Sequence, residues 1–103
     1  MSYQEAFNRL LAEEDVESST MMKTPCLRFK GEFLGMFFDK EDALIIKVSP
    51  QRVNQIIELE LGREFNFTKK RFKEWVLIPS EQEEQFDRFL TEALNYAKGK
   101  QKQ

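Results

Sequence analysis

The chain has 103 residues, a formal net charge of −2, no histidine and one cysteine. This length fits one domain with a single core that needs neither disulfides nor metal. The small charge gives no overall field that would draw the chain to nucleic acid or an anionic membrane. Without histidine and with one cysteine, the chain lacks the usual zinc ligands, and a serine triad would lack its base. We therefore expect no cofactor, no metal and no enzymatic activity.

The sequence predicts neither a signal peptide nor a membrane span. The N-terminal segment carries Glu5 and lacks a basic start followed by an apolar run. The longest apolar stretch, residues 33–38, is too short to cross a bilayer. Cys26 has no cysteine partner, so the chain does not require an oxidising compartment. We expect a cytoplasmic protein with no membrane partner.

A short amphipathic helix is predicted at the start of the chain. Ser2 and Glu5 have the spacing of a capping box, and apolar residues follow at helical spacing to about Glu14. The acidic and small residues 13–19 then predict a polar connector, and Pro25 disfavours helix before it.

Three strands are predicted next, at residues 27–29, 33–38 and 44–48. The links between them, residues 30–31 and 39–42, are short and polar, so consecutive strands must run antiparallel. A sheet of antiparallel neighbours follows from these spacings.

A second helix is predicted from Ser49, which would cap it, with Pro50 at its first position. Its apolar stripe stops at Gly62, which is typical of a helix end. Residues 64–67 predict a short strand, and the basic residues 69–71 predict a turn into the next strand.

The last strand, residues 72–78, is terminated by Pro79. Ser80 and Glu83 have the spacing of a second capping box, and a long helix with one apolar face would end near Gly99, followed by a frayed tail. The predicted fold is a single α+β domain over residues 1–103. Its antiparallel sheet has helices packed mainly on one face, in the order α-β-β-β-α-β-β-α.

Four stretches of the sequence carry a resemblance to a known family: Met21-Met22 before Pro25, residues 27–36, residues 44–48 and residues 72–79. The most specific is Lys-Glu-Trp-Val-Leu-Ile-Pro at residues 73–79, followed by a helix. Together they resemble the N-terminal domain of TfoX/Sxy, the bacterial competence regulator, which also occurs as short stand-alone proteins. The resemblance implies a fold similar to YjbR-like and secretion-chaperone-like domains, and it implies no catalytic residue. Lys23 and Thr24 depart from the small residues usual in the family.

The alternation of side chains along the strands suggests a binding surface. If helices cover one face of the sheet, the other face would expose Trp75, Ile45 and Met36 beside Lys47 and Lys73. Such a mixed aromatic and cationic surface suits a protein partner or a second copy of the chain, and it would also allow stacking of single-stranded bases. The alternative is that Trp75 is an ordinary core residue or is covered. On the last strand this alternation places Phe72, Glu74, Val76 and Ile78 opposite Lys73, Trp75 and Leu77.

Three other features have a functional and a structural interpretation. The basic run of Lys69, Lys70, Arg71 and Lys73 would bind nucleic acid, or it is a solvated turn. Glu74 is the best candidate for a carboxyl of raised pKa, although a solvated or ion-paired strand residue explains it better. Cys26 lacks a base that would activate it, which favours a half-buried position at a strand start.

The function that these patterns favour is that of a non-enzymatic interaction or regulatory domain. It would bind a protein partner or itself through the sheet surface. The alternative is a nucleic-acid-binding domain that uses the basic turn at residues 69–73.

Overall fold

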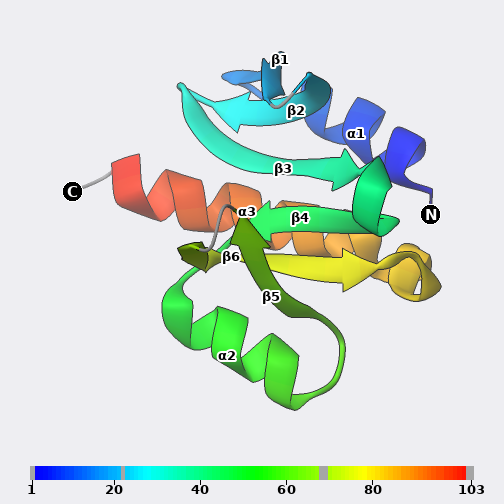
Figure 1. The fold of residues 1–103 in the computed structure, drawn as a ribbon. Helices are drawn as coiled ribbons and strands as arrows, with labels where there is room; N and C mark the ends of the chain where they lie inside the picture. Colours follow the sequence, from blue (N-terminus) through cyan, green and yellow to red (C-terminus); the bar gives the residue numbers. More distant parts are fainter. Residues whose placement is uncertain (1, 22, 68–69, 102–103) are drawn as a thin grey trace.

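Six strands form one antiparallel sheet, in the order β1-β2-β3-β4-β6-β5 (Figure 1). The computed structural model describes residues 2–21, 23–67 and 70–101. Its elements are α1 (Tyr3–Leu11), β1 (Val16–Met21), β2 (Thr24–Phe29), β3 (Glu32–Phe38), β4 (Ala43–Lys47), α2 (Pro50–Glu58), β5 (Arg63–Phe67), β6 (Lys70–Pro79) and α3 (Phe86–Gln101). Two short 3-10 helices, η1 (Asp39–Glu41) and η2 (Ser80–Gln85), connect strands to the elements that follow.

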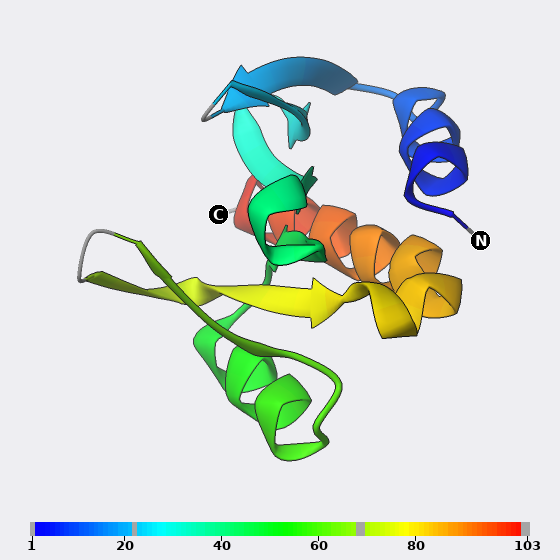
Figure 2. The same ribbon diagram turned by 45° about the vertical axis from the view of Figure 1, so that its right-hand side comes forward.

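The helices pack mainly on one face of the sheet, and the predicted α+β class is confirmed. Figure 2 shows α1 and α3 together on one side of the strands, with α2 below β6. A large apolar core fills the space between this face and the helices. The strands contribute Leu27, Leu34, Leu44, Ile46, Val76 and Ile78, and α3 contributes Phe86, Phe89, Leu90, Ala93, Leu94 and Ala97.

Two helix starts are set by the local sequence, as predicted. The Ser2 hydroxyl accepts a hydrogen bond from the Glu5 backbone N–H at 3.2 Å, and the Glu5 carboxylate accepts one from the Ser2 N–H at 3.1 Å. The Ser49 hydroxyl accepts from the Arg52 N–H at 3.2 Å, with Pro50 at the first helical position. These side chains satisfy backbone donors that have no partner within the helix.

The prediction of a polar connector at residues 13–19 is wrong. Residues from Val16 to Met21 form β1, which pairs with β2 along its whole length. Only Val16 is buried in this strand, because β1 lies at the edge of the sheet and its other side chains are at least partly exposed. Backbone hydrogen bonds to β2 hold this edge strand in the sheet. Its sequence therefore does not need the alternation of apolar and polar residues by which a strand is predicted.

The second predicted capping box is also wrong. The Ser80 hydroxyl donates to the Asp42 carboxylate at 2.7 Å, and the Ser80 N–H donates to the Asp42 carbonyl at 3.1 Å. Ser80 therefore joins η2 to the turn after η1, and α3 begins only at Phe86. The apolar face predicted for this helix is confirmed, since its six apolar residues are all buried.

Gly35 allows α3 to lie close to the sheet. A Cβ at this position would lie 2.7 Å from the Ile45 carbonyl oxygen and 2.8 Å from Leu90 Cδ2. The pairing of β2 with β3 shifts register between Leu27 and Arg28, close to this contact. The absence of a side chain is therefore a packing requirement at Gly35.

Candidate functional site

The face of the sheet opposite the helices is apolar and rich in aromatic residues. We call it the aromatic face and define it by one cluster of side chains. Its buried members are Cys26, Phe33, Met36, Ala43, Ile45, Phe65 and Leu77, and its partly buried members are Met21, Phe38, Phe72 and Trp75. No member belongs to an α-helix in the part of the chain that the structure describes. A sheet face without helices is ordinarily polar, so this composition needs an explanation.

Trp75 occupies the middle of this face and is half-buried. Its ring stacks on that of Phe33, with ring centroids 4.4 Å apart and planes inclined by 18°. Phe65 and Phe72 contact the same indole, with centroid distances of 5.4 Å and 5.0 Å. Strand β4 places Lys47 opposite Trp75 in the pairing of β4 with β6.

The prediction that Ile45 and Met36 would be exposed is wrong, because both have exposed fractions of 0%. Among the described residues, the cluster that contains them has no member from an α-helix. They are buried by the rings of their own face, in which Phe65 contacts both Phe38 and Phe72 edge to face. The exposed part of the aromatic face is therefore an outer layer of partly buried side chains that includes Trp75.

Phe72 lies on the same face as Trp75, contrary to the alternation predicted for this strand. Glu64 of β5 pairs with Val76 of β6, and Asn66 pairs with Arg71. An advance of two residues along β5 therefore corresponds to five residues along β6. This irregularity breaks the two-residue period that the prediction assumed. It brings a second large ring against the indole of Trp75, at 5.0 Å between centroids.

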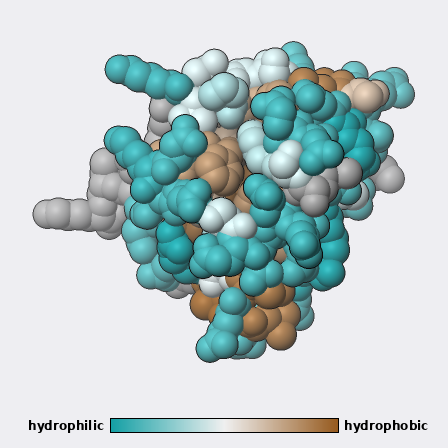
Figure 3. Space-filling model, turned by 90° about the vertical axis from the view of Figure 1, so that its right-hand side faces the viewer, coloured by the Kyte–Doolittle hydropathy of each residue, from teal (hydrophilic) through white to brown (hydrophobic). Residues whose placement is uncertain are grey.

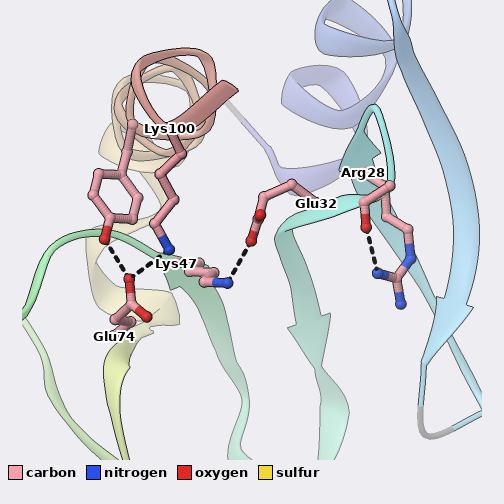
Figure 4. A network of polar contacts seen from close by, with 7 residues as sticks. Arg28, Glu32, Lys47, Glu74 and Lys100 are labelled. Carbon is pink, nitrogen blue, oxygen red and sulfur yellow. Dashed lines mark hydrogen bonds and ion pairs between the residues drawn. The ribbon is translucent and has the colours of Figure 1, made fainter. Parts of the chain in front are cut away.

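A polar network borders the aromatic face where β3, β4 and β6 approach the end of α3 (Figure 4). Lys47 donates to the Glu32 carboxylate. The Glu74 carboxylate accepts from the Tyr96 hydroxyl and, at 3.0 Å, from Lys100 Nζ. Lys47 is thus ion-paired as well as placed next to the aromatic face.

Glu74 and Cys26, the two residues considered for catalysis, both have surroundings that are explained by the packing and ion pairing of the fold. Partial burial alone would raise the pKa of Glu74, but hydrogen bonds from Tyr96 and Lys100 outweigh it and the pKa is lowered. The expectation of a raised pKa is wrong, and the ion-paired alternative is confirmed. Cys26 is buried, and burial raises the pKa of its thiol against a smaller opposing effect of Arg28. A thiol in this state is a poor nucleophile.

The basic run is only partly described. Lys69 lies outside the described residues, and for Lys70 and Arg71 the structure gives backbone positions in β6 but no side-chain description. Lys73 is exposed. Lys70 and Arg71 begin β6 and pair with Phe67 and Asn66 of β5. The prediction of a turn is therefore wrong for these two residues, which belong to the strand.

Sequence reasoning missed the other rings of the aromatic face, namely Phe33, Phe38, Phe65 and Phe72. A signal for them was present in the ten phenylalanines of the 103-residue chain, which indicate a large buried aromatic content. Within the described ranges, no group of acidic, cysteine or histidine side chains is arranged to hold a metal ion. Over the same ranges, no helix has the length and apolar character of a membrane span.

Comparison with known proteins gives no match: no protein-family model, no curated protein and no solved structure is similar to this chain.

Proposed function

We propose that this chain is a non-enzymatic domain that binds a protein partner through the aromatic face. One observation carries the proposal: in the described part of the chain, the face without helices is covered by its own side chains, with Trp75 and Phe72 half-buried at its surface. Tryptophan and other aromatic residues are enriched in protein interfaces because a large ring gains much contact area at low entropic cost.

The surroundings of Trp75 support a protein as the partner. Exposed Lys73 and ion-paired Lys47 place polar groups beside the aromatic layer, and Glu32 adds an acidic group. An apolar centre with a polar rim is the usual composition of a protein interface. The resemblance of residues 73–79 to the TfoX N-terminal domain agrees with an interaction or regulatory role.

The experiment uses Trp75 as its own reporter, since it is the only tryptophan of the chain. The tagged protein captures partners from a lysate of its host, with and without nuclease, and each captured protein is then purified. Addition of a true partner should shift the emission of Trp75 to shorter wavelength and protect it from acrylamide. A captured protein that leaves the emission of Trp75 unchanged would exclude the aromatic face as its binding site.

Charge reversal tests the same surface without disturbing its packing. Lys73→Glu changes an exposed side chain two residues before Trp75 in β6, and Lys40→Glu makes the same change on η1. We expect Lys73→Glu to weaken binding about tenfold and Lys40→Glu to leave it unchanged. Equal effects of the two variants would contradict the proposal. Association of the chain with itself is a further outcome, detected by a molar mass that rises with concentration and falls in Lys73→Glu.

Nucleic-acid binding is the alternative function, favoured by the basic residues Lys70 and Arg71, which begin β6 and pair with the end of β5. A positively charged hairpin can contact phosphates while rings stack on bases. This function requires affinity that falls steeply with salt concentration and disappears when Lys69, Lys70, Arg71 and Lys73 are changed to glutamine. Nuclease-sensitive capture in the experiment above would favour it over a protein partner.

A further inference from the structure

A second concave site lies on the helix side of the sheet, away from the aromatic face. A cavity of about 380 Å³ opens between the first turns of α1 and the adjoining ends of β2 and β3. Figure 3 views the molecule from the side of α1 and η1 and shows apolar areas that alternate with hydrophilic side chains. Three rings form its apolar wall: Tyr3 lies 5.6 Å from both Phe7 and Phe37 between centroids.

The polar groups of this cavity belong to three different elements. Gln4 comes from α1, Thr24 from the start of β2, and Asp39 from η1. The side chain of Asp39 is exposed, and its carboxylate forms no ion pair with any residue that the structure describes. An apolar wall with one unpaired carboxylate at its edge favours a ligand with an apolar body and a positive charge.

The wall also contains a buried phenol, that of Tyr3, which interacts with the Phe37 backbone without a well-formed hydrogen bond. The Tyr3 hydroxyl is buried and makes no well-formed hydrogen bond with the described part of the chain. Buried phenols ordinarily have a partner, because an unsatisfied hydroxyl costs stability. Features that cost stability are expected mainly at sites kept for function.

Competing charges near the cavity do not favour an anion. The N-terminal end of α1 would attract a negative group, but the capping box of Ser2 and Glu5 occupies two of its backbone donors and places the Glu5 carboxylate there. On η1, Lys40 lies beside Asp39, and Glu41 is paired with Arg63. Asp39 is the charged group among the described residues that line the cavity, so the opening favours a cation.

From these observations we infer that the cavity is a binding site for a small aromatic amine. Its ring would pack among Tyr3, Phe7 and Phe37, and its ammonium group would pair with Asp39. The inference is independent of the protein-binding function proposed above, since no residue is shared between the cavity and the aromatic face.

Three probes of similar shape test the site: 2-phenylethylammonium, 2-phenylethanol and 3-phenylpropionate. Each is titrated into isotope-labelled protein, and amide chemical shifts are followed by NMR. We expect shifts centred on Gln4, Thr24 and Asp39, with the cation binding about threefold more tightly than the alcohol, as an exposed ion pair allows. The anion should bind most weakly. No saturable shift with any probe, or equal binding of cation and anion, would overturn the inference.

Single variants test separately how the Asp39 charge and the shape of the cavity contribute to binding. Asp39→Asn should remove the preference for the cation and leave binding of the alcohol unchanged. Gln4→Phe should fill the opening and weaken all three probes about tenfold, whereas Asn8→Phe, one turn further along the exposed side of α1, should not. Retention of the cation preference in Asp39→Asn, or equal effects of Gln4→Phe and Asn8→Phe, would contradict this placement of the ligand.

Discussion

The ring of Trp75 on β6 stacks on the ring of Phe33 on β3 across the intervening strand β4, with centroids 4.4 Å apart. The two residues are far apart in the sequence and come together only because β4 separates their strands in the sheet. This contact joins the N-terminal and C-terminal parts of the sheet on the face without helices. It has a structural role as well as the proposed binding role.

Trp75→Ala should lower the free energy of unfolding by about 2 kcal/mol, less than for a fully buried ring because the indole is half-buried. Trp75→Phe should retain most of the stability, since a ring would still stack on Phe33 and Phe72. Guanidinium unfolding followed by far-ultraviolet circular dichroism measures both variants. An unfolding free energy unchanged in Trp75→Ala would mean that the stacking contributes nothing to the fold.

Tyr3→Phe should raise the free energy of unfolding at neutral pH by about 1 kcal/mol. The substitution removes a buried hydroxyl that lacks a well-formed hydrogen bond and keeps the ring. Tyr96→Phe is the matched control and should have the opposite sign, because it removes a hydrogen bond to Glu74. Thermal unfolding of the two variants side by side tests this difference, and a loss of stability in Tyr3→Phe would refute it.

Tyr3 also predicts a dependence of stability on alkaline pH. Burial raises the pKa of this phenol in the folded state above its ordinary value of 10.0. Ionisation of Tyr3 therefore leaves the stability of the protein unaffected below pH 10 and lowers it as the pH rises above that value, because only the unfolded state ionises readily. The stability of Tyr3→Phe should fall less than that of the wild type over the same range, as measured by denaturant unfolding at increasing pH.

Glu74→Gln should lower stability at neutral pH by less than about 1 kcal/mol, since the carboxylate is only partly buried. The pKa of Glu74 is lowered in the fold, so its contribution is present above the ordinary carboxyl pKa of 4.5 and is lost as the pH falls through the folded value. The difference between wild type and variant should therefore shrink on acidification. Glu84→Gln, an exposed change on η2, supplies the control. A difference that grows towards acid pH would contradict this sign.

Gly35→Ala should destabilise the protein by about 2 kcal/mol, because its new methyl would meet the Ile45 carbonyl and the Leu90 side chain below 3 Å. Gly99→Ala is the matched control: no atom lies within 4 Å of its Cβ, and the residue lies inside α3. That variant should gain about 0.5 kcal/mol from helix propensity. Chemical denaturation of both proteins distinguishes packing from propensity, and equal stabilities would show that the close approach at Gly35 is not required.

Features that depend on neighbouring residues are predictable from the sequence. The caps at Ser2 and Ser49 and the buried face of α3 follow from hydrogen bonding and periodicity within a few residues. The three central strands and their antiparallel order follow from short links. The candidate Trp75 was found in the same way, as a large ring on a strand.

Only the tertiary structure decided what depends on distant partners. The edge strand β1 has no apolar alternation, since its pairing with β2 is made by backbone groups. The placement of Phe72 beside Trp75 depends on a register shift against β5, and the burial of Ile45 and Met36 depends on rings supplied by other strands. The cavity at Tyr3 requires α1 to meet β2, β3 and η1. Side-chain periodicity records which face a residue takes on its own element, but it does not record what that face will contact.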